Sequence, residues 1–180
     1  MKSTPDVPVC PRCQKSLTRR SHRSGIIERI ASLLYVYPFR CQLCAHRFLA
    51  QQWGVRYEKQ RLDLREYVRI PIRLSVKFMG QFEGHGTTVD LSLQGCCVLT
   101  EQCPPAGAVL WLALQGTDRL PTIEVQSALV VGVRKTPSIG IQFLHMAPVQ
   151  YSQLQQVIGE QLRAHPEYLL QANPVGLSGP

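Results

Sequence analysis

The sequence contains no hydrophobic run long enough to cross a membrane. Its best candidate, "GIIERIASLLYVYPF", is interrupted by Glu28 and Arg29, whereas a spanning helix needs about 20 consecutive apolar residues. The stretch "MKSTPDVPVC" also lacks the apolar core of a signal peptide. We therefore expect a soluble, cytoplasmic protein.

Patterns of catalytic residues are missing as well. The chain shows no set of nucleophile, base and acid and no phosphate-binding P-loop. We therefore expect that the protein is not an enzyme. Aromatic residues make up only 7% of the chain, and they are sparse among the basic residues of the N-terminal third. Base stacking in a nucleic-acid complex would need more of them there.

Acidic residues are scarce only in the N-terminal third. Residues 1–60 hold 11 Lys and Arg against 3 Asp and Glu, whereas residues 61–180 hold 9 of each kind. The formal net charge of +8 therefore lies entirely in this third. Such a segment attracts nucleic acid, anionic lipid or an acidic protein surface, and a metal site built from thiolates also calls for compensating charge. The charge alone does not distinguish among these partners and the metal site.

Cysteine is present in pairs that indicate metal binding. "CPRC" (Cys10, Cys13) and "CQLC" (Cys41, Cys44) are two CxxC knuckles with 27 residues between them. Each knuckle can present two sulfurs to one ion, so the four thiolates can close a tetrahedral site. Zinc is the expected metal, in a structural role, because four thiolates leave no open position for water.

The wording "CPRC…FRCQLCAHRF" resembles the zinc-ribbon family, with Arg40 before the second knuckle and Phe48 after it. We expect a zinc-ribbon domain over residues 8–50. The stretch "SGIIERIASLLYVY" predicts one short helix inside it, with Ser24 as the N-cap. The basic residues of this domain either contact nucleic-acid phosphates or form a solvated surface, and the helix either docks a protein or the neighbouring domain or lies on a membrane.

The rest of the chain is dominated by β-strand patterns. Residues 51–64 read as a linker, and about six short runs of β-branched and aromatic residues follow, separated by Gly, Pro, Ser and Asp. They predict a small antiparallel barrel or sandwich whose first strand, "VRIPIRLSVKF", is an edge or bulged because of Pro71. The stretch after Pro148 predicts a helix, because its apolar residues recur at helical spacing: Leu154, Val157, Ile158 and Leu162. Residues 166–180 read as a disordered tail.

Two polar motifs in this region suit a guanine nucleotide. Arg65 and Arg69 lie four residues apart at the entrance of the first strand, and an arginine fork can bond the O6 and N7 edge of guanine or stack on its ring. Asp90, Ser92 and Gly95 form D-x-S-x-x-G at a turn. The carboxylate can accept from guanine N1–H and N2–H2, the hydroxyl can bond a base or phosphate, and Gly permits the turn and close approach.

These residues, "REYVR" followed by a strand, "DLSLQG" and a closing "GIQF", resemble the PilZ domain family. The resemblance implies a six-stranded antiparallel β-barrel that binds the bacterial second messenger cyclic di-GMP. It implies that Arg65 and Arg69 clasp the ligand and that Asp90, Ser92 and Gly95 hold a guanine. Many members carry adjacent arginines at the first motif, but Leu64 stands here instead. Arg61 is a further candidate contact.

We therefore expect a mainly β protein: a small zinc ribbon at residues 8–50, a linker at 51–64, and a PilZ-like barrel with a C-terminal helix at 65–165. Its expected function is that of a cyclic di-GMP receptor. Ligand binding would reorder the linker and reposition the ribbon to alter binding of an unidentified protein partner. Two alternatives are a nucleic-acid-binding regulator acting through the basic ribbon and an interaction adaptor that binds no ligand.

Overall fold

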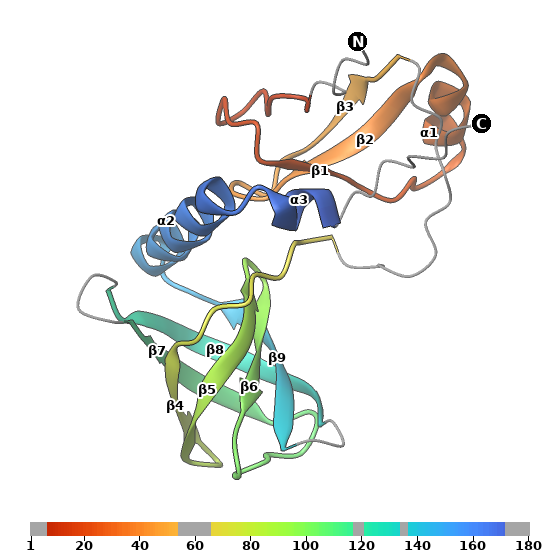
Figure 1. Cartoon of the computed structure of the whole chain (residues 1–180). Helices are drawn as coiled ribbons and strands as arrows, with labels where there is room; N and C mark the ends of the chain where they lie inside the picture. The colour runs from red at the N-terminus through yellow and green to blue at the C-terminus, as the bar shows by residue number, and fades with distance from the viewer. Residues whose placement is uncertain (1–6, 54–65, 117–120, 134–136, 172–180) are drawn as a thin grey trace. The chain divides into compact units, whose positions relative to one another are not determined.

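The computed structural model describes residues 7–53, 66–116, 121–133 and 137–171 (Figure 1). The chain divides into two compact units, one made of residues 1–68 with 162–180 and the other of residues 69–161. Each unit is described by itself. Among the described residues, none of the helices has both the length and the apolar character that crossing a membrane requires.

The first unit contains a three-stranded antiparallel sheet in the order β1-β2-β3. Its strands are β1 (Thr18–Arg20), β2 (Val36–Cys41) and β3 (Arg47–Gln51). Between β1 and β2 the chain forms the helix α1 (Ile26–Ala31) and the 3-10 turn η1 (Ser32–Leu34). The short helix expected inside the cysteine-bounded unit is therefore confirmed.

The N-cap of α1 differs from the expected one. Gly25, with φ of 90° and no side-chain cap bond, takes that position. Ser24 lies one residue earlier, and its backbone N–H donates to the Glu28 carboxylate at 2.5 Å. Glu28 therefore accepts from a backbone N–H that precedes the helix, whereas an N-cap serine would accept from an N–H of the first turn.

The apolar core of the sheet is small. Tyr37 and Phe39 of β2 are buried, and the rings of Phe39 and Phe48 stack with 6.0 Å between their centroids. The Arg20 guanidinium lies over the Tyr37 ring, 4.3 Å from its centroid. Besides the cysteines, the other buried apolar side chains of this unit among the described residues are Leu17, Tyr67, Val68 and Leu162. This is little hydrophobic area for an independent domain, so the unit needs a further source of stability.

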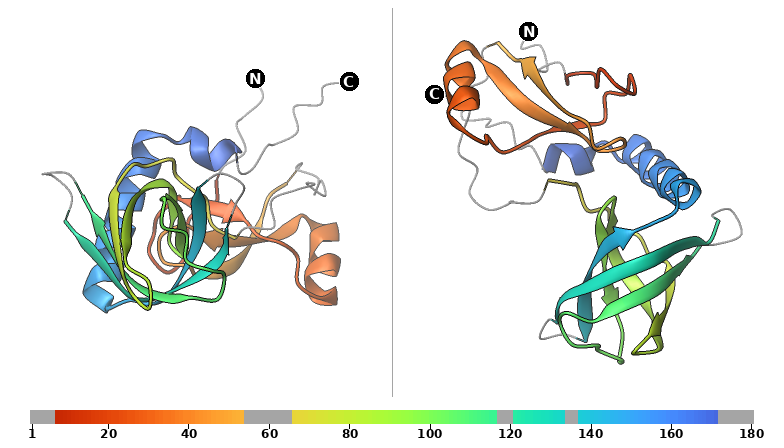
Figure 2. Two further views of the ribbon diagram at one scale, coloured as in Figure 1. Left: turned by 90° about the horizontal axis from the view of Figure 1, so that it is seen from below. Right: turned by 180° about the vertical axis from the view of Figure 1, so that it is seen from behind.

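The second unit is a closed antiparallel barrel in the order β4-β5-β6-β9-β8-β7 (Figures 1 and 2). Closure leaves no edge strand, and the prediction of a six-stranded barrel is confirmed. The strand bounds are β4 (Ser75–Gly80), β5 (Gly84–Ser92), β6 (Gly95–Leu99), β7 (Val109–Gln115), β8 (Ile123–Val133) and β9 (Ser138–His145).

The first barrel strand begins later than the sequence pattern predicted. The apolar alternation from Val68 predicted a strand over 68–78, but β4 starts at Ser75. Before it, Ile70 alone forms an isolated bridge, with Leu91. Pro71 follows directly and has no N–H to donate, so a ladder cannot continue through it.

A long helix, α2 (Pro148–Ala164), follows the barrel strands, as the sequence predicted. Its four predicted apolar positions, Leu154, Val157, Ile158 and Leu162, are each at most 3% exposed. The Gln150 side chain accepts a hydrogen bond from the Glu124 N–H of β8 at 2.9 Å. A short helix, α3 (Glu167–Gln171), then forms after Pro166 in the range predicted to be disordered; residues 172–180 lie outside the described residues.

Candidate functional site

The segment that leads into β4 is bound to β5. Ile70 and Leu91 exchange two backbone hydrogen bonds of 2.8 and 2.9 Å. The Thr88 hydroxyl, fully buried, accepts from Leu74 N–H at 2.8 Å and donates to the Ile72 carbonyl. These contacts fix the backbone on both sides of Pro71. They hold Arg69, the residue before Ile70, beside the end of β5.

A β-bulge places Asp90 on the barrel surface. Thr88 pairs with Val98 and Asp90 pairs with Cys97, so Val89 is the extra residue on β5. In an unbroken strand Asp90 would share the face of buried Thr88. The bulge shifts this alternation, so that Leu91 takes the buried face and the Asp90 side chain remains 21% exposed.

Arg69 and Asp90, one from each predicted motif, form an ion pair. Arg69 Nη1 lies 2.6 Å from Asp90 Oδ1, and the two side chains are 24% and 21% exposed. The pair is therefore partly open to solvent at the barrel surface. A guanidinium plane and a carboxylate held together there can engage a purine edge with donors and acceptors at once.

Ser92 and Gly95 shape the turn that carries Asp90. The Ser92 hydroxyl is buried and donates to the Gly95 carbonyl at 3.0 Å. A Cβ on Gly95 would lie 2.1 Å from the Ile141 carbonyl oxygen, so β9 itself occupies the space that a side chain would need. Both residues maintain the turn between β5 and β6 in this structure, and their contact with a ligand stays a prediction.

Two predicted ligand contacts, Arg65 and Arg61, lie outside the described residues. Nothing in the structure therefore tests the first arginine of the RxxxR motif.

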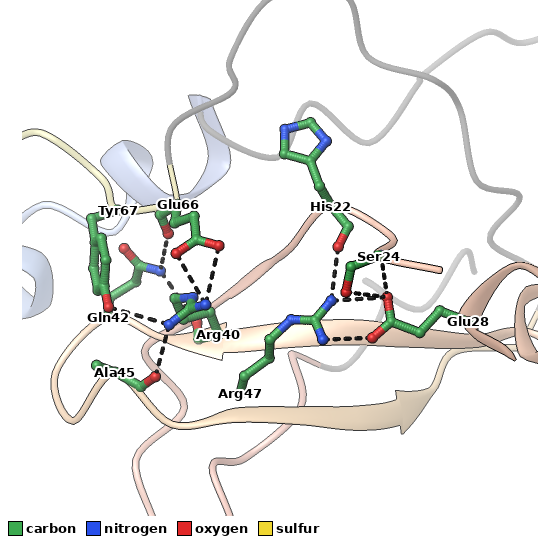
Figure 3. A network of polar contacts seen from close by, with 9 residues as sticks. All are labelled: His22, Ser24, Glu28, Arg40, Gln42, Ala45, Arg47, Glu66 and Tyr67. Carbon is green, nitrogen blue, oxygen red and sulfur yellow. Dashed lines mark hydrogen bonds and ion pairs between the residues drawn. The ribbon is translucent and has the colours of Figure 1, made fainter. Parts of the chain in front are cut away.

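The three residues before Arg69 are held by residues of the second cysteine knuckle, and Figure 3 shows the contacts of two of them, Glu66 and Tyr67. Arg40 Nη2 lies 3.0 and 3.1 Å from the two carboxylate oxygens of Glu66. Its Nη1 donates to the Tyr67 hydroxyl at 3.3 Å and to the Ala45 carbonyl at 3.2 Å. Burial raises the pKa of the Tyr67 phenol above its ordinary value, so the hydroxyl stays neutral near pH 7.

Gln42 completes this arrangement, which we call the knuckle clasp: Arg40 and Gln42 holding residues 66–68. The Gln42 side chain is buried, accepts from the Val68 N–H at 2.7 Å and donates to the Glu66 carbonyl at 3.2 Å. Sequence reasoning missed the clasp. Gln42 is one of the two residues between the cysteines of "CQLC", and no spacing rule links it to a segment 24 residues downstream.

The four cysteines of the two knuckles converge on one point. All four Sγ atoms lie within 4.8 Å of one another, with Cys10 and Cys44 3.6 Å apart and Cys13 and Cys41 3.5 Å apart. A tetrahedral zinc ion with bonds of about 2.3 Å places its sulfurs about 3.8 Å apart. The cluster therefore has the donor atoms and the size for one zinc ion.

The two knuckles share the same local geometry. Cys10 N–H donates to the Lys15 carbonyl and Cys41 N–H to the His46 carbonyl, both at 2.9 Å. The residue after each second cysteine, Gln14 and Ala45, has a positive φ near 60°. Burial raises the pKa of the Cys41 and Cys44 thiols, whereas for Cys10 burial is outweighed by hydrogen bonds within the cluster, which lower its pKa. Burial of the second knuckle therefore disfavours its thiolates unless a cation balances their charge.

The fold and the polar pair on its surface define a class of protein, a small closed β-barrel with an arginine–aspartate ion pair where the chain enters it. A comparison with family models makes that class specific: residues 63–160, more than half of the chain, match the PilZ domain. The chain therefore belongs to the PilZ domain family, and it carries a four-cysteine module before the matched region. Among curated proteins, none matches the sequence closely enough to count as a relative.

Three solved structures are similar to this chain at low sequence identity. YcgR from Escherichia coli in complex with c-di-GMP is 18% identical with a TM-score of 0.50, covering 87% of this chain and 77% of that one. The PilZ domain of the same protein with c-di-GMP is 21% identical (TM-score 0.47; 60% and 96% covered). The inhibitor of motility MotI/DgrA from Bacillus subtilis is 19% identical (TM-score 0.49; 72% and 75% covered).

Proposed function

We propose that this protein is a cyclic di-GMP receptor. The observation that carries the proposal is the Arg69–Asp90 pair, because it joins the second arginine of RxxxR to the aspartate of DxSxxG at 2.6 Å on the barrel surface. Membership of the PilZ family supports it, as does the c-di-GMP bound to the E. coli structure of the same fold. Arg65 and Arg69 would engage guanine and phosphate, and Asp90 would accept from a guanine edge.

We further propose that the four cysteines hold a structural zinc ion. The small core of the ribbon supports this, since binding of the metal would supply the folding free energy that hydrophobic burial does not. Positive charge around the cluster compensates the four thiolates. In this proposal the zinc ion keeps the ribbon folded as one rigid body, and neither the ion nor the ribbon reacts with the ligand.

The knuckle clasp suggests how the ribbon would respond to the ligand. Val68 belongs to the first unit and Arg69 is the first residue of the barrel unit, so one peptide bond separates a residue held by Gln42 from the arginine held by Asp90. A ligand that binds both Arg65 and Arg69 changes the conformation of the backbone between them. Arg40 and Gln42 are hydrogen-bonded to residues 66–68, so the ribbon moves when these residues move. The contact between the ribbon and a protein partner then changes.

Calorimetric titration of cyclic di-GMP into the zinc-loaded full chain tests the receptor. We expect saturable binding that Arg69→Ala and Asp90→Asn each abolish. The ion pair is partly exposed, so its loss should reduce folding stability by only about 1 kcal/mol. Arg73→Ala is the matched control, because Arg73 is exposed four residues further along the same segment and should leave affinity unchanged.

Two results would overturn the receptor proposal. One is the absence of saturable binding at high micromolar ligand, and the other is wild-type affinity in Arg69→Ala. Salt-dependent binding to nucleic acid that is unaffected by cyclic di-GMP would favour a nucleic-acid-binding regulator instead.

Transmission through the clasp has its own test. Small-angle scattering of the full chain should show a change in radius of gyration when ligand saturates the wild type. In Gln42→Leu the ligand should still bind, but the change should be reduced, because only Arg40 is left to hold the ribbon to residues 66–68. A full change in Gln42→Leu would refute transmission through the clasp without touching the receptor proposal.

A further inference from the structure

The helix α1 presents its polar side to the ribbon and its apolar side to solvent. Its acidic residue, Glu28, is buried and pairs with Arg47 of β3, with Nη1 2.5 Å from Oε1 and Nη2 2.8 Å from Oε2 (Figure 3). The same Arg47 Nη2 donates to the His22 carbonyl at 2.9 Å. The Arg47 guanidinium holds the pKa of Glu28 below its ordinary value. This ion pair fixes which side of the helix faces inward.

Ser32, one turn after Glu28, makes the second inward polar contact. Its hydroxyl accepts from Arg23 Nη1 at 2.8 Å and donates to the Arg29 carbonyl at 2.6 Å. Residues four apart lie on the same side of a helix, so Glu28 and Ser32 together define the face that packs on the ribbon. Ordinary amphipathic helices of globular domains are oriented the other way round.

The opposite face is a stripe of large apolar side chains in solvent. These residues are 59% to 80% exposed and fall at i, i+1, i+4, i+7 and i+8, which places them on one side of the helix and its 3-10 extension. We call them the apolar stripe: Ile26, Ile27, Ile30, Leu33 and Leu34. Isolated exposed hydrophobic residues are common on proteins, but a contiguous group marks an interaction surface.

An exposed tryptophan borders the stripe. The Tyr35 carbonyl, next to Leu34, accepts from Gln52 N–H at 2.8 Å. The rings of Tyr35 and Trp53 lie 5.3 Å apart, and Trp53 is 72% exposed. Tryptophan and tyrosine favour the boundary between an apolar phase and water, because one end of each ring system is polar.

The ribbon around the stripe is strongly basic. Residues 7–53 contain eight Lys and Arg but a single acidic residue, Glu28, whose charge is already paired with Arg47. Even a zinc ion with four thiolates, which carries a formal charge of −2, leaves this part of the chain with a net positive charge. Arg29, inside α1, and Arg12 and Lys15, in the first knuckle, are exposed.

We propose that the apolar stripe docks the ribbon onto an anionic lipid bilayer. The stripe and Trp53 would enter the boundary between headgroups and acyl chains, and the basic residues would lie against anionic headgroups. At nine residues the stripe is only about 13 Å long, a length that suits insertion beside headgroups better than the extended seam of a helix–helix contact. A second copy of the chain would bring two positively charged ribbons together. The proposal is independent of the cyclic di-GMP site.

Co-sedimentation with vesicles tests the proposal on the zinc-loaded full chain without ligand. We expect binding to vesicles of phosphatidylcholine mixed with phosphatidylglycerol, much weaker binding to phosphatidylcholine alone, and weakening with added salt. Ile27→Ser with Ile30→Ser should lower partitioning at least about tenfold. Both side chains are more than half exposed, so the double variant should keep its fold.

A matched control removes exposed apolar side chains elsewhere. Val131→Ser with Val149→Ser changes residues that are 54% and 67% exposed on β8 and α2, and it should bind vesicles as the wild type does. In a Trp111→Phe background, which leaves Trp53 as the remaining tryptophan, emission should shift to shorter wavelength on binding anionic vesicles.

The proposal is overturned if the wild type does not bind anionic vesicles or if the Ile27 and Ile30 double variant binds them equally well. It is also overturned if sedimentation shows a dimer that this double variant abolishes while vesicles remain unbound, because the stripe would then serve self-association.

Discussion

Replacing Gln42 by leucine should weaken the hold of the ribbon on residues 66–68. Leucine keeps the approximate size of the side chain but removes the acceptor for the Val68 N–H at 2.7 Å and the donor to the Glu66 carbonyl at 3.2 Å. Val68 is buried, whereas Glu66 is exposed. Water can therefore replace the bond to Glu66 but cannot easily reach the Val68 amide.

The expected change in the exchange rate of the Val68 amide follows from the loss of its buried hydrogen bond. A buried donor left without a partner costs about 1–3 kcal/mol. Taking a middle value of about 2 kcal/mol, the equilibrium for local opening of this segment rises by a factor of about 30. The exchange rate of the Val68 amide with deuterium should rise by the same factor, because exchange proceeds through the open form.

Hydrogen exchange followed by NMR measures this rate directly. The Leu91 amide, bonded to the Ile70 carbonyl at 2.9 Å in the barrel, serves as the internal reference and should not change. Gln42→Glu keeps the acceptor and should give a smaller effect than Gln42→Leu. Gln81→Leu alters an exposed glutamine and is the matched control. A change of less than about twofold at Val68 in Gln42→Leu would show that the clasp contributes nothing to holding this segment.

Three further predictions concern other parts of the structure. Gly95→Ala should destabilise the barrel by about 2–4 kcal/mol in urea unfolding, because its Cβ would lie 2.1 Å from the Ile141 carbonyl oxygen; a loss under about 0.5 kcal/mol would contradict this. Chelation of zinc, or Cys41→Ser, should remove about one zinc per chain and the exchange protection of β1–β3 while the barrel amides stay protected. Arg47 lowers the pKa of Glu28, so their pair should stabilise the ribbon above the ordinary carboxyl pKa near 4.5 and lose that contribution as the pH falls through the lowered value. Glu28→Gln should abolish this acid-side dependence in a pH series of thermal unfolding.

Sequence patterns were sufficient where the physical constraint is local or strictly periodic. The CxxC spacing predicted a four-sulfur cluster, because a tight turn between two cysteines presents both sulfurs to one side whatever surrounds it. Alternating apolar residues predicted most barrel strands, and helical spacing predicted the four buried residues of α2. The two polar motifs were recognisable from residue types alone, and the structure brings Arg69 and Asp90 together.

The strand predictions failed where a single residue interrupts the alternation of buried and exposed side chains. The alternation from Val68 continues through Pro71 in sequence, but the strand begins only at Ser75, because proline cannot donate to a ladder. The extra residue Val89 reverses the alternation in β5, and nothing in "TTVDLS" marks it as a bulge. A strict strand period would have turned Asp90 toward the buried face.

By itself, the sequence determined that this chain has a four-cysteine module with metal-ligand spacing, a β-barrel and two motifs suited to a guanine nucleotide, since these depend on residue type and short spacing. Only the tertiary structure decided which groups those residues face. It paired Arg69 with Asp90 across 21 positions, placed Gln42 and Arg40 on residues 66–68, and turned α1 so that Glu28 meets Arg47 and its isoleucines meet solvent. Each of these contacts joins residues far apart in the chain, and the energy that selects such a pairing depends on the distance and burial that the whole fold creates.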